Sequence, residues 1–294
     1  MKNKLLLVDG MALLFRGFFS TSFRGNFMYT KDRIPTNGVH QFLRYFLHAI
    51  HTYEPTHVIC CWDMGSKTFR TELFDQYKGN RPPPPEELVP QFEIVREVVE
   101  AFDVPNIGIE NYEADDCIGT IARQQNERFK VTILSGDHDL LQLVDNDVQV
   151  AIMKKGIGNY ELYTRENFYE KVGLHAEQII DFKGLMGDSS DNYPGVKGIG
   201  EKTALKLMRE YDSVDNLLTC VEELPKGTKT KLQENVDMLF LSQKLAAIHC
   251  DVPLTCNVDD ACWNIDLQKI MHIGKTYELT RVLERELAHV QTTY

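Results

Sequence analysis

The sequence predicts an α/β fold, in which helices flank a central, mostly parallel sheet and a helical part follows. Short apolar runs rich in branched residues, each ending near an aspartate, are typical of buried parallel strands. Such runs occur at residues 5–8, 58–62 and 131–134. Stretches that we interpret as helices lie between or after them, at residues 39–50, 92–102 and 113–125. Strands that alternate with helices along a chain form parallel sheets.

The pattern changes near residue 175, beyond which the chain is typical of helices joined by short loops, with no convincing strand. We therefore expect an α/β core over residues 1–175 and a helical part over residues 176–294. Four consecutive prolines at residues 82–85 form a stiff, extended stretch. This stretch lies between a basic segment and a predicted helix, so we interpret it as part of an exposed loop and not as a domain linker.

The composition is that of an ordinary globular protein. Of the 294 residues, 43% are hydrophobic and 26% are charged. No run of about eighteen apolar residues predicts a membrane span, and the run at residues 5–8 is too short for a signal-peptide core, so we expect a cytoplasmic protein. The seven cysteines include no Cys-x-x-Cys pair, so we expect free thiols and not a zinc site or a disulfide framework.

The net charge of −11 at pH 7 argues, taken alone, against a nucleic-acid partner. The distribution of the basic residues argues the other way, because they gather in four segments, at residues 16–33, 67–81, 197–209 and 226–231. Any one such cluster is more commonly a solvated surface. Four clusters beside a dense set of acids are harder to explain in that way.

Aspartates lie at the ends of all three predicted strands. Asp9, Asp63 and Asp137 come just where the strands end, and ligands of open parallel sheets bind outside the carboxyl ends of the strands. Further acids follow in the loop after Asp137, at the start of a predicted helix and in residues 187–191. The full set is Asp9, Asp63, Glu113, Asp115, Asp116, Asp137, Asp139, Asp188 and Asp191. Any one of them alone is more commonly a helix cap or a turn former.

Up to nine carboxylates at one edge of a sheet would repel each other strongly unless cations neutralised them. A ligand set of oxygens, without histidine or cysteine, favours Mg²⁺ or Mn²⁺ over zinc. Two such ions about 4 Å apart suit in-line displacement at phosphorus, because one activates water and both stabilise the developing charge. The acids therefore predict metal-dependent hydrolysis of a phosphate ester.

A glycine-rich turn, Gly-Val-Lys-Gly-Ile-Gly-Glu-Lys-Thr-Ala, occupies residues 195–204 between two predicted helices. A Gly-Ile-Gly turn at the start of a helix exposes backbone N–H groups that can hold a phosphate without reading a base. The basic neighbours and the Thr-Ala-x-x-Leu continuation favour a helix-hairpin-helix that binds DNA over an ordinary loop between packed helices. We place it near residues 185–210, with candidate contacts at Lys197, Gly198, Gly200, Lys202 and Thr203.

Three motifs together resemble the flap endonuclease family. They are Glu-Ala-Asp-Asp at residues 113–116, Ser-Gly-Asp-His-Asp-Leu-Leu-Gln at residues 135–142, and the segment at residues 187–204 that begins Gly-Asp-Ser-Ser-Asp-Asn-Tyr-Pro. Within this family the chain is most similar to the 5′-3′ exonuclease domain of bacterial DNA polymerase I and its free-standing bacterial relatives. The resemblance covers roughly residues 3–290, and no polymerase region follows residue 294, so the free-standing form is the better match.

The resemblance implies a PIN-like nuclease core and a role for each matching residue. Asp9, Asp63, Glu113, Asp115 and Asp116 match the acids of a first metal cluster, and the remaining four acids complete a second. The positions that handle the scissile phosphate and the threaded strand match Arg16, Tyr77, Lys78, Arg81 and Lys183. Arg16, Lys78, Asp9 and Asp63 are the catalytic candidates. The helical arch of the family corresponds to residues 66–90, and the hairpin is similar to one that holds a potassium ion against duplex phosphates.

We therefore expect a monomeric, Mg²⁺- or Mn²⁺-dependent nuclease that acts on DNA with 5′ ends, nicks or flaps in replication or repair, with no membrane partner. The resemblance also includes an RNase H-like activity, which makes RNA primers in RNA–DNA hybrids a candidate substrate. The alternative is a non-catalytic DNA-structure-binding protein, and the intact acid set disfavours it. Two features depart from the family pattern: His138 stands where a lysine is common, and the run of prolines predicts a stiffer arch.

Overall fold

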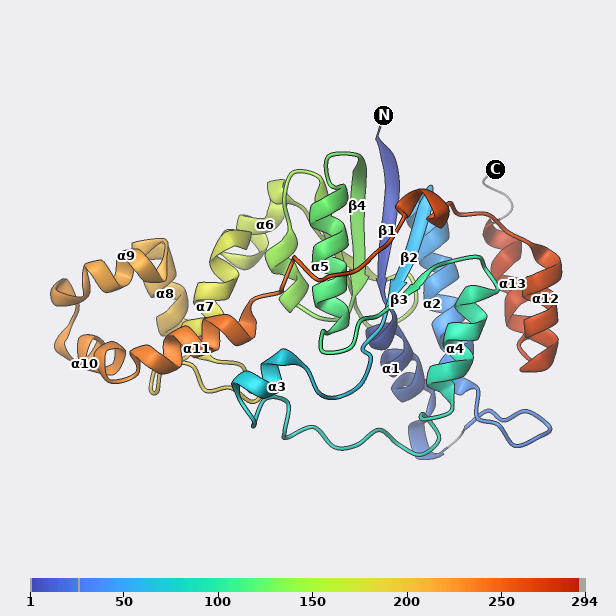
Figure 1. The fold of residues 1–294 in the computed structure, drawn as a ribbon, viewed down its shortest axis with the longest axis horizontal. Helices are drawn as coiled ribbons and strands as arrows, with labels where there is room; N and C mark the ends of the chain where they lie inside the picture. Colours follow the sequence, from blue (N-terminus) through green and yellow to red (C-terminus); the bar gives the residue numbers. More distant parts are fainter. Residues whose placement is uncertain (1, 26, 291–294) are drawn as a thin grey trace.

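The computed structural model describes residues 2–25 and 27–290, and at its centre lies a six-stranded sheet (Figure 1). The strands are β1 (Asn3–Asp9), β2 (His57–Cys61), β3 (Asn106–Ile107), β4 (Phe129–Ser135), β5 (Val148–Met153) and β6 (Tyr160–Tyr163). Their order in the sheet is β3-β2-β1-β4-β5-β6. All neighbouring pairs are parallel except β5 and β6, which are antiparallel, so the predicted mostly parallel sheet is confirmed.

The apolar runs of the sequence form the interior of this sheet. Leu7 of β1 lies in register with Ile59 of β2 and Ile133 of β4, and all three side chains are fully buried. Successive residues of a strand point to opposite faces, so Leu6 and Val8 contribute to one core and Leu7 to the other. A strand that is buried on both faces shows a continuous apolar run, which is why these strands could be read from the sequence.

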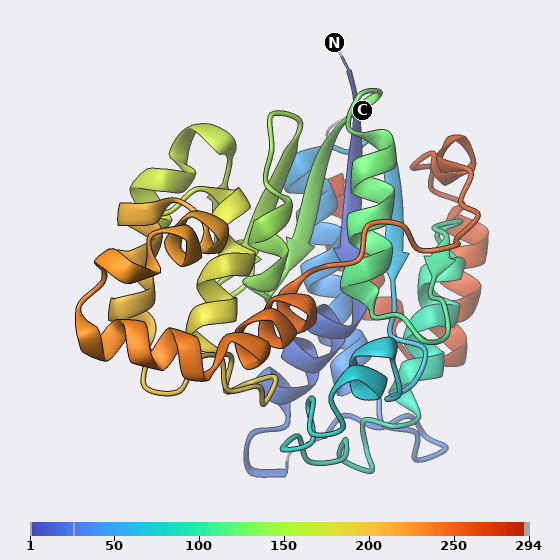
Figure 2. The ribbon, with the colours of Figure 1, turned by 60° about the vertical axis from the view of Figure 1, so that its left-hand side comes forward.

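Helices cover both faces of the sheet (Figures 1 and 2). The core on one face includes side chains of α1 (Gly10–Thr21), α2 (Asn37–Tyr53), α4 (Gln91–Glu100), α12 (Leu267–Thr276) and α13 (Thr280–Val290). The core on the other face is built mainly on α5 (Ala114–Gln125). The three helices predicted from the sequence correspond to α2, α4 and α5.

The helical part has a core of its own, to which Leu185, Leu207 and Leu239 contribute. Its helices are α7 (Ile179–Met186), α8 (Glu201–Tyr211), α9 (Val214–Thr219), α10 (Lys226–Glu234) and α11 (Val236–Ala246). The preceding helix, α6 (Arg165–Val172), packs Phe168 into the core of the sheet. From residue 176 to residue 290 the structure contains no strand. The chain then returns to the sheet, where α12 contacts α4 and α13 contacts α2. The expected helical unit of residues 176–294 is therefore too long at its end, and residues 291–294 lie outside the described part.

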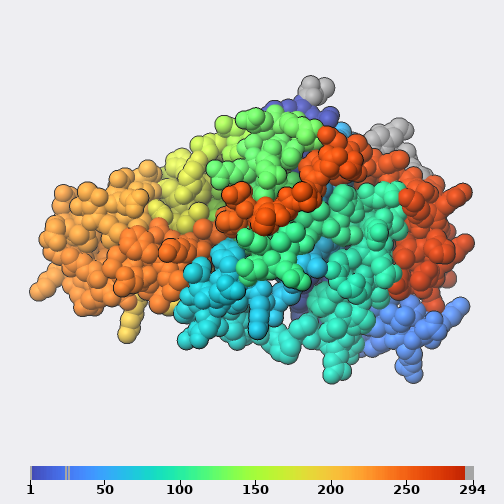
Figure 3. All heavy atoms as spheres, in the orientation of Figure 1, coloured from blue at the N-terminus to red at the C-terminus, as the bar shows by residue number. Residues whose placement is uncertain are grey.

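The segment expected to form a helical arch, residues 66–90, contains one short helix, α3 (Phe69–Leu73), followed by turns and extended chain. The expectation of a helical segment is thus wrong for most of its length. Lys78 has a positive φ of 54°, and the four prolines lack N–H donors and disfavour helix in the residue before each of them. Figure 3 shows this segment at the surface, and α3 contacts α11.

None of the helices within residues 2–25 and 27–290 is long and apolar enough to cross a lipid bilayer. All seven cysteines are free thiols, as the sequence predicted, and three of them are buried: Cys60, Cys61 and Cys117.

Candidate active site

The carboxyl end of β1 carries a buried acid of the predicted set. Asp9 is the last residue of the strand and caps α1, because its carboxylate accepts a hydrogen bond from the backbone N–H of Ala12 at 2.9 Å. Its other oxygen accepts the hydroxyl of Ser135 at 2.5 Å, which joins the ends of β1 and β4. Burial, followed by the charges of Asp63 and Asp137, raises the pKa of Asp9 to about 7.

Three more acids lie near Asp9. Asp63 follows β2 and accepts the backbone N–H of Ala114 at 2.7 Å, which holds the start of α5 against the end of β2. Asp115 lies in the first turn of α5, and its burial together with the charges of Asp137 and Asp9 raises its pKa. Asp9, Asp63, Asp115 and Asp137 therefore form one acidic group at the edge that the strand pattern predicted.

A second acidic group extends from β4 to the helical part. Burial and the charge of Asp137 raise the pKa of Asp139 to about 7, although the Lys183 ammonium opposes this rise. Lys183 Nζ contacts the carboxylate of Asp139 and lies 2.7 Å from Asp188 Oδ2. Burial alone would raise the pKa of Asp188, but hydrogen bonds from Lys183 and Ser190 lower it to about 2. Lys183 thus neutralises two of the predicted metal ligands.

The turns after α3 reach the same acids. Lys78 Nζ lies 2.7 Å from Glu113 Oε1, and Arg81 Nη2 lies 2.6 Å from Asp191 Oδ1. The hydroxyl of Tyr77 is 2.9 Å from Asp191 Oδ2 and 3.2 Å from Glu113 Oε2. Three side chains expected to handle the phosphate therefore contact two expected metal ligands.

Arg16, another expected phosphate contact, lies at the same edge of the sheet. Its Nη2 donates a hydrogen bond of 2.6 Å to the carbonyl of Met153, the last residue of β5. This places a guanidinium group beside the strand ends that carry the acids. His138, whose role the sequence left open, is exposed between Asp137 and Asp139, and its partial burial lowers its pKa.

Asp116 has a different partner from the acids of the two groups. It is fully buried, and Arg70 donates to both of its oxygens at 2.8 Å. The structure therefore does not bring Asp116 to the metal site that the sequence predicted for it. Sequence reasoning also missed Arg70, which it treated as one member of a basic cluster, because nothing local in the sequence indicates that this side chain is buried.

The donor set fits a hard divalent cation, since every acid of the two groups offers carboxylate oxygens. Among the residues that the structure describes, no three His, Cys, Asp or Glu side chains are arranged as ligands of a single ion. Mg²⁺ does not require such a cluster, because it commonly binds one or two carboxylates and completes its shell with water and phosphate oxygens. Two groups of acids that share Asp137 are compatible with two ions.

The glycine-rich turn between α7 and α8 is tightly fixed. Gly195 has a φ of +62°, and a Cβ there would lie 2.2 Å from the backbone nitrogen of Gly187, so the position requires glycine. The N–H of Val196 donates to Leu185 O, and the N–H of Ile199 donates to Val196 O, both at 2.9 Å. Both side chains are buried, and the residues beside them, Lys197, Gly198 and Gly200, face outward.

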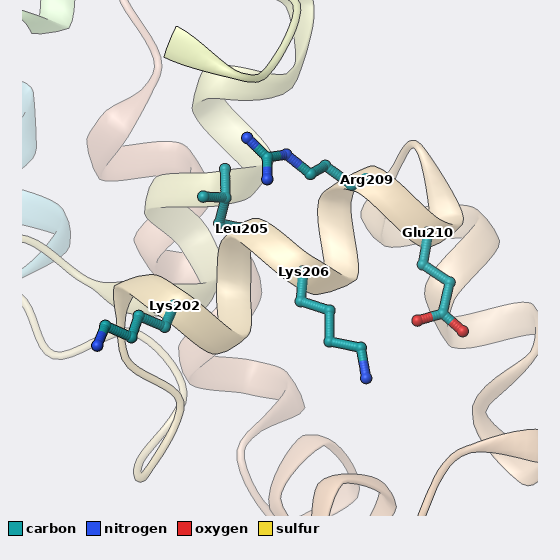
Figure 4. Close-up of a pocket in the computed structure, with 5 residues that line it drawn as sticks. All are labelled: Lys202, Leu205, Lys206, Arg209 and Glu210. Atoms are coloured by element: carbon teal, nitrogen blue, oxygen red, sulfur yellow. The ribbon is translucent and has the colours of Figure 1, made fainter.

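The first helix after this turn presents a basic surface. A shallow pocket on α8 is lined by Lys202, Leu205, Lys206, Arg209 and Glu210, and Figure 4 shows the Lys202 and Lys206 side chains extending outward from the helix. The tip of the turn receives a further cation from α10. Lys231 Nζ donates a hydrogen bond of 2.8 Å to the carbonyl of Gly198. Lysines of two helices, α8 directly after the turn and α10 further along the chain, thus lie on or beside the hairpin.

Two family models match consecutive parts of the chain. The 5′-3′ exonuclease, N-terminal resolvase-like domain matches residues 4–173, and the 5′-3′ exonuclease, C-terminal SAM fold matches residues 174–269. Among solved structures, the bacteriophage T5 flap endonuclease in complex with DNA and metal ions has a TM-score of 0.68 at 23% identity, with coverage of 98% of this chain and 100% of that chain. The catalytic core of Rad2 in complex with DNA substrate has a TM-score of 0.64 at 16% identity, with coverage of 98% and 92%. At these identities the similarity shows that the fold is shared.

Relatives at higher identity specify the family. The chain is 52% identical over 286 residues to a 5′-3′ exonuclease of Bacillus subtilis (strain 168), covering 96% of this chain and 97% of the relative. It is 44% identical over 289 residues to DNA polymerase I of Bacillus caldotenax, covering 97% of this chain but 32% of the polymerase. Matched by both family models and by a relative along nearly its whole length, the chain belongs to the 5′-3′ exonuclease family and is a nuclease, as its motifs predicted.

Proposed function

We propose that this nuclease uses two Mg²⁺ ions, for which Mn²⁺ can substitute, to cleave DNA at 5′ ends, nicks and flaps. The observation that carries the proposal is the gathering of acids at one edge of the sheet, where the pKa values of buried Asp9 and half-buried Asp139 are both raised to about 7. Acids are held in such an environment at a cost in stability, and a divalent cation would remove that cost. Perturbed carboxyl groups of this kind concentrate at functional sites.

We assign one ion to the group formed by Asp9, Asp63, Asp115 and Asp137. The second ion belongs to the group that includes Asp139, Asp188 and Asp191, with Glu113 between the two. When bound, the ions supply an activated water and neutralise the charge that develops at phosphorus. Neither ion is assigned to Asp116, which the motif predicted as a ligand, because both of its carboxylate oxygens accept hydrogen bonds from Arg70.

The side chains that contact these acids would orient the substrate. Lys78, Arg16 and Arg81 would bind the scissile phosphate and its neighbours, and Tyr77 would hold Asp191 and Glu113 through its hydroxyl group. Lys183 would move its ammonium group from the acids toward the phosphate when metal ions bind. The proposal is supported by the contacts of Lys78, Arg81 and Lys183 with carboxylates of the acidic groups, and by the bond from Arg16 to the carbonyl at the end of β5.

Duplex DNA would bind along the hairpin and α8. Lys197, Gly198, Gly200, Lys202 and Thr203 would contact phosphates without reading bases, and a potassium ion would add charge at the turn. The T5 flap endonuclease, Rad2 and human GEN1 were crystallised with DNA, and their shared fold is what leads us to this placement. RNA–DNA hybrids are a second candidate substrate. We expect a monomer that works in the cytoplasm, where free thiols persist.

The decisive experiment compares cleavage and binding on the same substrates. Nicked, gapped and 5′-flapped duplexes are incubated with the protein under single-turnover conditions, with Mg²⁺, with Mn²⁺ or in excess chelator, and the product lengths are measured. We expect both metals to support cleavage that leaves a 5′-phosphate and chelator to abolish it, while DNA binding persists. Full cleavage in excess chelator would disprove metal dependence. Binding without cleavage under all conditions would favour a DNA-structure-binding protein.

A further inference from the structure

Arg70 lies where three segments of the chain meet. It belongs to α3, its side chain is 2% exposed, and its partners come from α5 and from the end of α11. A buried guanidinium group is costly unless its charge and all of its N–H groups have partners. The identity of those partners therefore indicates what the surrounding residues are for.

Every donor of Arg70 has an acceptor. Its Nε donates to Leu245 O at 3.0 Å, and Nη2 donates to Ala247 O at 2.7 Å. Nη1 and Nη2 each donate to one oxygen of Asp116 at 2.8 Å, and Nη1 also lies 3.3 Å from Glu113 Oε2. An arginine carries five N–H donors, and five acceptors surround this one. Two of the acceptors are carbonyls at the carboxyl end of α11, where a helix attracts positive charge.

The carboxylate of Asp116 is equally saturated. Besides the two bonds from Arg70, Oδ1 accepts the backbone N–H of His249 at 2.8 Å, and Oδ2 accepts the backbone N–H of Glu113 at 3.0 Å. A carboxylate has about four acceptor positions, and all of them are in use. A metal ion bound to Asp116 would have to displace Arg70 and leave a buried guanidinium group without a counterion.

Asp115, the preceding residue, provides a matched contrast. Adjacent residues of a helix point in directions about 100° apart, so the two carboxylates of this motif face different surroundings. Asp115 is half-buried and faces Asp137 and Asp9, whereas Asp116 is completely buried and faces a cation. Asp115 thus lies among like charges, and Asp116 lies in an ion pair.

We propose that Asp116 is the buried partner of Arg70 and not a metal ligand, and that Arg70 is a positioning residue for the active site. The pair joins α3, the start of α5 and the end of α11, and Arg70 also touches Glu113, which carries the contact from Lys78. The turns that carry Tyr77 and Lys78 follow directly after α3 in the chain. Arg70 would therefore fix these residues relative to the acids. This inference refines the proposed metal site and rests on it for the role of Asp115.

The first test measures the thermal midpoint of unfolding in metal-free buffer. If Asp116 is the partner of Arg70, Asp116→Asn should lower this midpoint, whereas if Asp116 lies among like charges as a metal ligand, the same change should raise it. Asp115→Asn removes one of several like charges and should raise the thermal midpoint. Asp116→Asn leaves Arg70 buried without its counterion and should lower the midpoint by on the order of 10 °C. If Asp116→Asn raised the midpoint as Asp115→Asn does, the ion-pair assignment would be overturned. This test needs no catalysis, so its outcome is independent of the proposed function.

The second test measures metal directly, by calorimetric titration of Mn²⁺ without DNA and by the Mg²⁺ dependence of single-turnover cleavage. Asp115→Asn should weaken Mn²⁺ binding and raise the Mg²⁺ concentration for half-maximal rate. Asp116→Asn and Arg70→Lys should bind as many Mn²⁺ ions as the wild type and lower the maximal rate instead. Loss of a bound ion in Asp116→Asn, with Arg70→Lys unaffected in stability and rate, would overturn the proposal.

If Asp116→Asn does not fold, Arg70→Lys can test the proposal instead. This variant keeps the Asp116 carboxylate and the positive charge at residue 70, but a lysine cannot supply five N–H donors. A Lys variant with wild-type stability and rate would then overturn the positioning role. If the wild-type protein itself bound no Mn²⁺, the proposed metal site would fail, and the stability test would still decide the Arg70–Asp116 pair.

Discussion

The environment of Asp9 predicts that the metal-free protein becomes less stable as the pH rises. Burial and neighbouring acids raise the pKa of this group from 3.8 to about 7. Between these values the folded protein keeps the proton of Asp9, whereas the unfolded chain has released it. Raising the pH therefore favours unfolding throughout this window, and the effect levels off above about pH 7. A rise of about three pKa units corresponds to about 4 kcal/mol of unfolding free energy.

The prediction is tested most cleanly with the variant Asp9→Asn, which cannot ionise. Asparagine is also a good helix cap, so the bond from the Ala12 N–H can persist. We expect the stability of the variant relative to the wild type to increase between pH 4 and pH 8 by up to about 4 kcal/mol. The measurement is urea denaturation in metal-free buffer at several pH values. Because both proteins contain the same histidines, the titration of those groups cancels in the difference.

A control comes from Asp147, a half-buried acid whose pKa is lowered by a hydrogen bond from Lys2. Its stabilising effect is lost below the ordinary pKa of aspartate. The difference in unfolding free energy between Asp147→Asn and the wild type should therefore not change with pH above about pH 5. Added Mg²⁺ should stabilise the wild type more at pH 8 than at pH 5, since the metal binds the ionised form. The reasoning would be refuted if the stability of Asp9→Asn relative to the wild type stayed constant or decreased between pH 4 and pH 8.

Three further predictions concern the hairpin and the second acidic group. Lys231→Ala should weaken duplex binding equally at every DNA sequence and reduce the slope of log affinity against log salt concentration by about one. Lys229→Ala removes a lysine that is already paired with Glu222, so its effect should be smaller. Binding titrations at several salt concentrations measure both effects. Gly195→Ala should destabilise the protein by about 3 kcal/mol or more, because of its positive φ and because the added Cβ would clash with the backbone nitrogen of Gly187. An unchanged thermal midpoint would contradict this. Asp191→Asn should slow single-turnover cleavage by about a hundredfold while DNA binding in chelator persists, and wild-type rates would remove this residue from the catalytic site.

The parts of the fold that could be predicted are those where a local sequence pattern is compatible with only one kind of structure. Strands buried on both faces, such as β1, β2 and β4, have continuous apolar runs, and acids at their ends necessarily meet at one edge. β3 has two residues and β6 has four, three of them half-buried, so neither leaves a comparable pattern. The glycine-rich turn was also recognisable, and two of its glycines, Gly195 and Gly198, have a positive φ that few other residues tolerate.

What could not be predicted depends on contacts between distant residues. The 113–116 motif gave no sign that its last acid is turned toward Arg70, 46 residues earlier in the chain. The arch was expected to be helical from a resemblance, whereas the local chemistry of the prolines at residues 82–85 decided its conformation. The pairing of Lys183, Lys78 and Arg81 with acids was also not predicted, because a cation expected to bind a phosphate gives no indication in the sequence of which carboxylate it contacts.

The return of the chain to the sheet after α11 has a mechanical consequence. The N–H of Trp263 donates to Thr56 O at 2.8 Å beside β2, and Arg44 of α2 pairs with Glu286 of α13 at 3.2 Å. The helical part is therefore connected to the sheet domain at both its start and its end, and not through a single linker (Figure 2). Because there are two connections, the helical part cannot rotate freely about either of them. A force that DNA exerts on the hairpin would therefore be transmitted to the sheet through both connections. A single protease cut within the hairpin should accordingly leave both fragments bound to each other.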